Sequence, residues 1–285
     1  MRSTLFLLTV LGLFPLAATA ESNPKRDPVT EFAANWQARA SKTQAEQPKW
    51  AVPMYSPFPM LAQVFRLDFT RQRSSTGADT WNIGGGKGFN FIPFEKTQVD
   101  VFFPGYLIHT DGAQDGFGDM TLVGKYRFLS APEKKGNYVV SGALGISIPT
   151  GSYKNGAAST ALTPTLLTGK GFGKLALMSS LGGTLPTSNT ATTGRTIHWN
   201  TVAQYKIGKY FSPEVELNSN TWVGGTRDGK TQMFISPGLI VGRLPFRPAD
   251  PHSRIGLTVG AAFQTAVTSY HTYNHALATT VRFVF

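Results

Sequence analysis

The sequence contains no cysteine, which excludes disulfides, thiolate metal sites and lipid attachment to an N-terminal cysteine. Acidic residues are scarce. There are 16 Asp and Glu against 27 Lys and Arg, so the formal net charge is +11. An excess of this size indicates an anionic partner, such as lipopolysaccharide, phospholipid or an acidic solute, or a lysine-rich surface with no dedicated partner.

Long apolar runs are missing too. The first run, LFLLTVLGLFPLA after Arg2, is followed by the small residues ATA up to Ala20. It is shorter than the roughly 20 residues of a membrane-spanning helix, and this pattern is typical of a secretory signal peptide. We therefore predict that residues 1–20 are removed on export, and nucleic acid is not an expected partner.

No later stretch approaches roughly 18 uninterrupted apolar residues, so a helical membrane anchor is excluded. This leaves a soluble exported protein or an outer-membrane β-barrel, whose strands give a much weaker hydropathy signal. The 30 glycines and the aromatic content of 12% are compatible with a β-rich chain.

Residues 21–60 differ from the rest. DPVTEFAANWQARA predicts a short helix, because Asp27 stands at the N-cap position and Val29, Phe32 and Trp36 share one face. Polar SKTQAEQPK and proline-broken WAVPMYSPFPM follow, which predict an extended segment. Two arrangements stay open, a plug inside a pore and a loosely ordered periplasmic tail, and the tail is favoured.

From residue 61 to residue 285 apolar and polar residues alternate, as in VFRLDFT and GDMTLVGKYRF. Such alternation gives each strand one apolar and one polar face. A soluble sandwich, with the apolar face inward, is the rival fold. Polar faces with both signs of charge, and aromatics near strand ends, favour the inverse arrangement. The predicted fold class is all-β, an antiparallel transmembrane β-barrel preceded by a short helical or extended segment.

The alternation predicts about twelve strands. They lie near residues 62–73, 80–92, 95–108, 117–130, 137–149, 160–169, 174–185, 195–207, 210–222, 231–242, 254–266 and 273–285. With both termini in the periplasm, the outer loops are longer and rich in Gly, Ser, Thr and Asn, whereas most periplasmic turns are short, as expected for such barrels. The long turn RLPFRPADPHS is an exception.

One region resembles a known family. Its residues are Gly116, Gly118, Asp119, Lys125, Tyr126 and Arg127, then Ile148, Pro149, Thr150 and Gly151. This Gly-x-Gly-Asp, Lys-Tyr-Arg and Pro-Thr-Gly pattern, within residues 85–155, is similar to that of the outer-membrane family named after the MetA pathway of phenol degradation. The resemblance implies a channel in the outer membrane of a Gram-negative bacterium, linked in some members to uptake of aromatic compounds. It assigns no residue a role in transport.

Charged residues on the predicted inner faces are candidates for lining the lumen and setting its selectivity. They are Arg66, Asp68, Asp100, Asp119, Lys125, Arg127, Lys206, Glu214, Glu216 and Arg282. They would form either a charged constriction or a ladder of ion pairs that holds the shape of the barrel, because a buried charge needs a partner. The ladder is the favoured interpretation.

Enzyme signatures are missing. HWN at His198 lacks the serine of an outer-membrane phospholipase, and no Ser or Thr follows Lys87 in GGGKG, so that stretch is not a phosphate loop. His271 and His275 would lie roughly 13 Å apart on a strand, too far to share a metal. No catalytic, metal or cofactor site is predicted, and the glycines of residues 84–88 are expected to bend their strand.

The stretch TTVRFVF places Val281, Phe283 and Phe285 on the lipid face and Arg282 on the lumen face. A terminal aromatic after alternating apolar residues resembles the signal that the barrel-assembly machinery recognises. Expected partners are this machinery, outer-membrane lipid with lipopolysaccharide, and a small-molecule solute. The predicted function is passive passage of small molecules, aromatic or hydrophobic compounds among them. A non-transporting surface, adhesion or structural barrel is the alternative.

Overall fold

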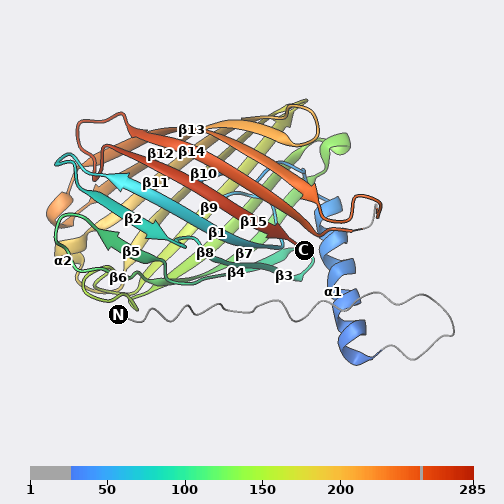
Figure 1. The fold of residues 1–285 in the computed structure, drawn as a ribbon, viewed down its shortest axis with the longest axis horizontal. Helices are drawn as coiled ribbons and strands as arrows, with labels where there is room; N and C mark the ends of the chain where they lie inside the picture. The colour runs from blue at the N-terminus through green and yellow to red at the C-terminus, as the bar shows by residue number, and fades with distance from the viewer. Residues whose placement is uncertain (1–26, 251–252) are drawn as a thin grey trace, which may run out of the picture.

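The computed structural model describes residues 27–250 and 253–285, so the predicted signal peptide lies outside the described residues. One antiparallel sheet closes on itself as a barrel (Figure 1). Its strands are β1 (Val64–Arg73), β2 (Asp79–Ile83), β3 (Gly88–Phe94), β4 (Thr97–Phe102), β5 (Tyr106–His109), β6 (Gly116–Phe117), β7 (Met120–Ala131), β8 (Tyr138–Ile148), β9 (Ala161–Phe172), β10 (Leu175–Pro186), β11 (Arg195–Tyr205), β12 (Phe211–Val223), β13 (Thr231–Pro245), β14 (Gly256–Ala266) and β15 (His275–Val284).

These segments make twelve wall strands, because three of the strands are interrupted. β2 and β3 both pair with β1, at opposite ends of it, and are two parts of one strand. β4 and β5 continue each other in the same way, as do β6 and β7. The ring closes where β1 pairs with β15 from Val64 opposite Val284 to Arg73 opposite His275. The predicted barrel of about twelve strands is confirmed.

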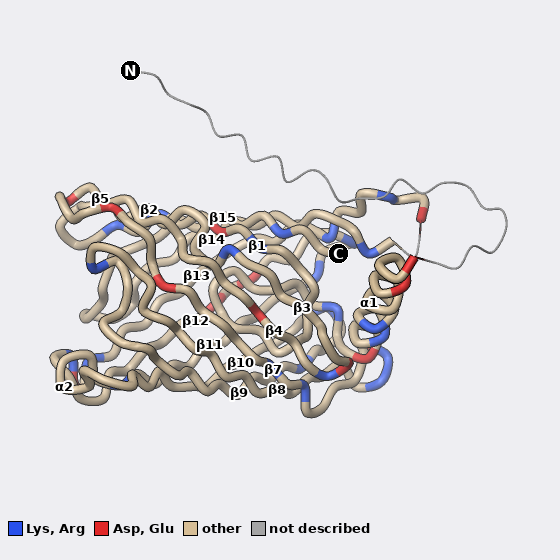
Figure 2. The backbone as a smooth tube through the Cα atoms, turned by 90° about the horizontal axis from the view of Figure 1, so that it is seen from below, with Lys and Arg blue, Asp and Glu red and all other residues tan. Residues whose placement is uncertain are grey.

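The barrel is polar inside and apolar outside. Glu216, Arg282 and Lys125 are buried, with exposed fractions of 0%, 2% and 4%, although they stand on strands whose alternate residues are exposed aromatic or aliphatic side chains. Few charged residues lie along the wall, and many gather at its two ends (Figure 2). An apolar outer belt around a closed ring of hydrogen-bonded strands is what a bilayer requires, so the barrel belongs in the outer membrane.

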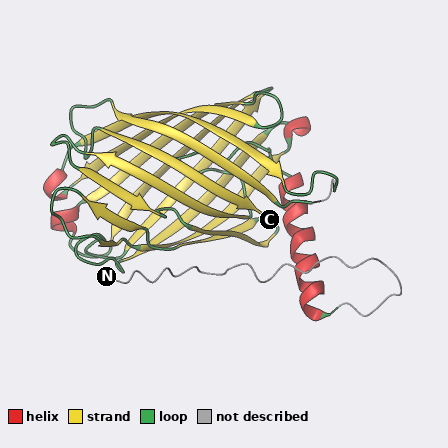
Figure 3. Ribbon diagram, viewed as in Figure 1, coloured by secondary structure: helices red, strands yellow, loops and turns green. Residues whose placement is uncertain are grey.

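The two ends of the barrel differ. The barrel end at which the C-terminus lies carries short turns, such as residues 95–96 and 173–174. At the other end, residues 149–160 and 187–194 form longer loops (Figure 3). Short turns are typical of the periplasmic side. The first end is therefore called the periplasmic end, and the long connection between β13 and β14, described for residues 246–250 and 253–255, also lies there.

Glycines stand at the interruptions between β2 and β3 and between β4 and β5. Gly84 and Gly86, between β2 and β3, have φ of 77° and 74°, which favour glycine because it has no side chain to clash. A β-carbon on Gly105, between β4 and β5, would lie 2.3 Å from Oδ1 of Asn82. The expected bend at residues 84–88 is present, and the neighbouring strand breaks at the same level.

The N-terminal helix α1 (Pro28–Ala45) lies across the periplasmic end. The turn α2 (Thr190–Thr193) lies in a loop at the other end, and the short 3-10 turns η1 (Glu133–Lys135) and η2 (Gly225–Arg227) lie in connections between strands. In the part of the chain that the structure describes, no helix has the length and apolar character to cross a bilayer.

Candidate functional site

Residues 47–61 form a loop inside the barrel, and we call this segment the inner loop. The side chain of Gln47 joins its two ends, since Nε2 donates to the carbonyl of Leu61 at 2.7 Å and Oε1 accepts from the N–H of Leu61 at 2.9 Å. Both ends of the inner loop therefore lie at the same height along the barrel axis. The favoured expectation of a tail outside the pore does not hold for these residues.

Two carboxylates of β12 bind the N–H groups of the inner loop. Oε1 of Glu216 accepts from Met54 at 2.8 Å and from Tyr55 at 2.9 Å, and its Oε2 accepts from Ser56 at 2.6 Å. Oε1 of Glu214 also accepts from Met54, at 3.0 Å. The carboxylates reach the same stretch because residues two apart on a strand share a face.

Basic side chains bind the carbonyl groups of the inner loop. Nζ of Lys125 donates to Phe58 at 3.0 Å and to Met60 at 3.3 Å, and it lies 3.8 Å from the ring centre of Phe58. On the other side, Arg282 donates to the carbonyls of Val52 and, at 2.8 Å, of Pro53. The acidic side chains thus bind N–H groups of the inner loop, and the basic side chains bind its carbonyl groups. Burying these backbone groups without hydrogen-bond partners would cost free energy.

Uncharged side chains of the wall also bind the inner loop. Together with the charged side chains described above, they form a set of residues that we call the cradle. Gln204 exchanges two hydrogen bonds with the backbone of Ala51, accepting at 2.9 Å and donating at 3.3 Å. The hydroxyl of Ser141 donates to the carbonyl of Pro59 at 2.6 Å. Sequence reasoning did not single out these residues, and their only signal is an inward position on an alternating strand.

Apolar packing supports the same arrangement. Phe58 and Met60 contact Val139, Met178 and Val202, which are inward residues of β8, β10 and β11. On the opposite wall Met54 packs against Ile240, Ala262 and Ala278. The inner loop therefore fills the lumen with apolar side chains while its backbone is bound by polar ones.

Four of the other predicted residues also point inward. Arg66 pairs with Asp68 at 2.6 Å and donates to the carbonyl of Met54 at 2.5 Å. Asp100 accepts from Asn90 at 2.5 Å and from Gln98 at 2.6 Å. Arg127 lies at the periplasmic end, where it binds the carbonyl of Thr43 at 2.7 Å and the carboxylate of Glu46 at 2.8 Å.

Two predicted residues are not part of the cradle. Asp119, between β6 and β7, accepts from the N–H groups of Gly151 and Ala157 at 2.9 and 2.6 Å and so holds an outer loop. Lys206 lies in the turn after β11, 4.0 Å from Glu133, and both side chains are about half exposed. The structure brings neither residue to the inner loop.

The formal charges of the buried side chains sum to zero when Arg127 at the periplasmic end is included. The charged side chains that are buried in residues 27–250 and 253–285 are Asp100, Glu214 and Glu216 on the acidic side and Lys125, Arg127 and Arg282 on the basic side. The partly buried pair of Arg66 and Asp68 adds one charge of each sign. The basic excess of the whole chain is therefore not located among these buried side chains.

Free space remains beside the inner loop. A cavity of about 270 Å³ lies between Met54 and Tyr55 on one side and Arg66, Asp68 and Asn82 on the wall. The hydroxyl of Tyr55 and Oδ1 of Asn82 are buried and have no hydrogen-bond partner among the described residues. The lining of the cavity combines apolar side chains with the polar side chains of Arg66, Asp68 and Thr70.

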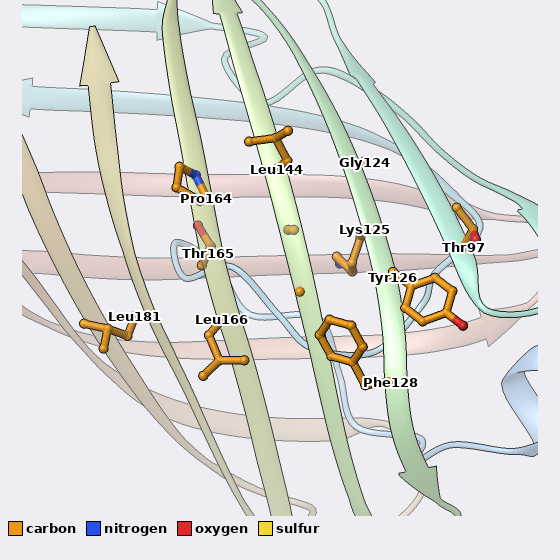
Figure 4. A pocket seen from close by; sticks show the side chains of 12 residues that line it. Thr97, Gly124, Lys125, Tyr126, Phe128, Leu144, Pro164, Thr165, Leu166 and Leu181 are labelled. Atoms are coloured by element: carbon orange, nitrogen blue, oxygen red, sulfur yellow. The ribbon is translucent and has the colours of Figure 1, made fainter.

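A larger hollow, of about 650 Å³, lies on the outer face of the wall over β7, β8 and β9 (Figure 4). Gly124 and Gly142 leave the space, and exposed Tyr126, Phe128 and Leu166 surround it. Because its rim is apolar and faces the bilayer, lipid chains would fill it. It is not part of the lumen.

The loop between β14 and β15 covers the outer end of the lumen. The ring of Tyr273 stacks on Phe234 with centres 4.5 Å apart, and its hydroxyl donates to Oε1 of Gln264 at 2.5 Å. Burial raises the pKa of Tyr273 to about 12, so the hydroxyl stays protonated at neutral pH. Gln264 donates to Asn218, which donates to the hydroxyl of Ser56, and this chain of hydrogen bonds links the outer loop to the inner loop.

The last residues of the chain lie beside the outer wall near the periplasmic end. Phe283 is exposed and lies 6.5 Å from Phe65 between ring centres, and Phe285 lies 6.4 Å from Phe91. Val281, on the same strand, pairs with Val259 and Leu67. These rings form part of an aromatic belt at one membrane interface.

No metal centre is present in the described ranges, where no three His, Cys, Asp or Glu side chains are arranged to hold an ion.

Solved structures share this architecture. The COG4313 outer membrane channel from Pseudomonas putida F1 aligns with a TM-score of 0.55 and 13% identity, over 83% of this chain and 100% of that one. The NanC porin aligns with a TM-score of 0.50 and 9% identity, over 79% of this chain and 99% of that one. At these identities the likeness shows the fold alone.

Sequence comparison is more specific about ancestry. No curated protein matches the chain. The family model described as "Putative MetA-pathway of phenol degradation" matches residues 61–241, which is more than half of the chain and includes the glycine-aspartate and lysine-tyrosine-arginine motifs. The chain therefore belongs to the family of the putative MetA pathway of phenol degradation.

Proposed function

We propose that this protein is an outer-membrane channel through which small uncharged molecules, aromatic and other hydrophobic compounds among them, diffuse passively. The observation that carries the proposal is the inner loop, which occupies the lumen but pairs with no wall strand. Side-chain hydrogen bonds and apolar contacts hold it. Such contacts can be released without breaking the strand ladder that holds the barrel together.

The preference for uncharged solutes follows from the charges of the buried side chains. Three buried acidic and three buried basic side chains, with Arg127 at the periplasmic end among them, carry no net formal charge, so we expect no strong attraction of either anions or cations. The cavity beside the inner loop is lined by polar Asp68 and Thr70 as well as by apolar Met54 and Phe102. A ring that carries a hydroxyl group matches this mixture of apolar wall and hydrogen-bonding atoms.

The proposed setting includes three further partners. Lipid chains would cover the apolar belt, and lipopolysaccharide would lie against the outer end. The barrel-assembly machinery would read Val281, Phe283 and Phe285.

Flux through the purified full-length protein in liposomes tests the proposal. Phenyl glucoside and xylitol serve as neutral solutes, and gluconate and glucosamine as charged solutes of similar size. We expect the neutral solutes to pass faster than the charged ones. Heat-dependent gel mobility shows in each preparation that the barrel is folded.

A second candidate is a non-transporting barrel that acts through its outer loops, and the filled lumen favours it. The variant Glu216→Gln, which weakens three hydrogen bonds to the inner loop, separates the two. Flux in neither the folded wild type nor the folded variant would overturn the channel and support the second candidate.

A further inference from the structure

The first half of α1 presents exposed apolar side chains, whereas Trp36 at its end contacts Phe91 and donates its indole N–H to Oε1 of Gln63. Val29 and Phe32 are 72% and 63% exposed. With Trp36 they lie on one face of the helix, since residues three and four apart are neighbours. Glu31 and Ala38 are also exposed and lie on the opposite face of the helix, and exposed Asn35 lies at its side. An exposed apolar stripe of this kind in a membrane protein needs a covering.

The second half of α1 is fixed to the barrel, so the position of the stripe is determined. Ala40 and Thr43 are buried, and the hydroxyl of Thr43 donates to the carbonyl of Glu95 at 2.9 Å. Lys42 pairs with the carboxylate of Glu95 at 2.6 Å. Held in this way, α1 lies crosswise to the long axis of the barrel (Figure 1), and hence along the plane of the membrane.

The stripe is continuous with the lipid-facing belt of the barrel. The ring centres of Phe32 and Trp36 are 5.6 Å apart, and those of Trp36 and Phe91 are 6.1 Å apart. Phe91 in turn contacts Phe89 at 5.2 Å and Phe285 at 6.4 Å. An unbroken row of aromatic rings therefore runs from the outer wall of the barrel onto the helix.

We propose that the first half of α1 lies in the inner leaflet of the outer membrane, at the boundary between headgroups and acyl chains. Its partner is phospholipid. Val29 and Phe32 enter the acyl region, and Trp36 sits at the interface, where its ring is favoured. The guanidinium of Arg39, 4.9 Å from the ring centre of Trp36, is placed to meet a lipid phosphate.

The membrane-bound helix is also connected to the inner loop in the lumen. Only Glu46 separates the end of α1 from the inner loop, and Glu46 binds Arg127 of the barrel wall. The membrane surface would therefore help to fix the point at which the inner loop enters the barrel. The anchor does not depend on solute passage, because it requires only that the barrel sits in a membrane.

The absence of cysteine makes a direct test clean. Single variants Val29→Cys, Phe32→Cys and Ala38→Cys carry a nitroxide label in phospholipid vesicles, with Phe263→Cys on the outer wall as the lipid reference. Collision with oxygen, which concentrates in the bilayer, is compared with collision with a water-soluble nickel chelate. Heat-dependent mobility confirms that every variant is folded.

We expect labels at positions 29 and 32 to show an oxygen-to-nickel ratio several-fold above that at position 38 and close to that at position 263. Equal ratios at 29, 32 and 38 would overturn the proposal. So would labels at 29 and 32 that both reagents fail to reach and that become accessible as the protein is diluted in lipid, because that result indicates a second copy of the chain rather than lipid.

Discussion

The carboxylate of Glu216 accepts a hydrogen bond from the backbone N–H of Met54 at 2.8 Å, although the two residues lie 162 positions apart. The N–H groups of Tyr55 and Ser56 share the same carboxylate. Glu216→Gln keeps the size but turns an NH₂ group toward one of these donors. Hydrogen bonds to a charged group contribute about 1.5–3 kcal/mol, so we expect the inner loop to leave its place more often and channel conductance to rise.

Planar-bilayer recording measures this effect. Glu133→Gln is the matched control, because Glu133 is about half exposed at a turn and binds nothing of the inner loop. Conductance that is present in the wild type and unchanged in the folded Glu216→Gln variant would show that the inner loop does not obstruct the lumen.

A second prediction concerns Gly88, where the wall strand resumes after its break. A β-carbon there would lie 2.0 Å from the carbonyl oxygen of Val101 and 2.8 Å from Cα of Phe102. Because backbone must shift to make room, Gly88→Ala should destabilise the barrel by about 1–3 kcal/mol. Gly124→Ala is the control, since a β-carbon at Gly124 meets nothing within 4 Å. Urea unfolding in micelles compares the two, and equal midpoints would contradict the prediction.

A third prediction follows from Tyr273 at the outer end. Burial raises its pKa to about 12, above the ordinary value of about 10. The protonated hydroxyl donates to Gln264, so the stability it contributes is complete below pH 10 and is lost as pH rises through 12. The absorbance titration at 295 nm, taken as wild type minus Tyr273→Phe, should show a midpoint near 12. A midpoint near 10 would mean that the loop does not cover the lumen in solution.

A fourth prediction separates assembly from stability at Phe285. Its ring meets Phe91, and its backbone exchanges hydrogen bonds with Gln63. Removing one aromatic contact costs about 0.5–1.5 kcal/mol, so Phe285→Ala should leave the refolded barrel nearly as stable as before. If the residue is read by the assembly machinery, the amount of folded barrel in outer membranes should fall several-fold. Phe263→Ala, which alters another exposed aromatic, should assemble normally.

The wall of the barrel was predictable because every strand must alternate apolar residues that face lipid with polar residues that face the lumen. The alternation in TTVRFVF, for example, matches the pairing of β15 with both β1 and β14. The bend at Gly84 and Gly86 was also expected from the sequence. The break beside Gly105 was not expected, because the close approach of Gly105 to Asn82 on the neighbouring strand leaves no local pattern in the sequence.

The contents of the lumen were less predictable. Lys125, Glu216 and Arg282 were expected to face opposite charges, whereas their hydrogen-bond partners are mainly backbone groups of the inner loop. Periodicity locates strands but says nothing about an irregular, proline-broken segment. The position of that segment depends on contacts with several strands at once. Acidic residues such as Asp100 and Asp68 were available on other strands, so nothing in the sequence indicated that backbone groups would bind Lys125 and Arg282.

The bridge from Gln47 to Leu61 has a topological consequence. A loop that enters and leaves the barrel through the same opening can move in or out as a hairpin. No chain end has to pass through the ring of strands. The order of events in biogenesis is therefore free, since the seam between β1 and β15 can seal before or after the lumen is filled. The same freedom would let a mature barrel empty and refill itself without opening that seam.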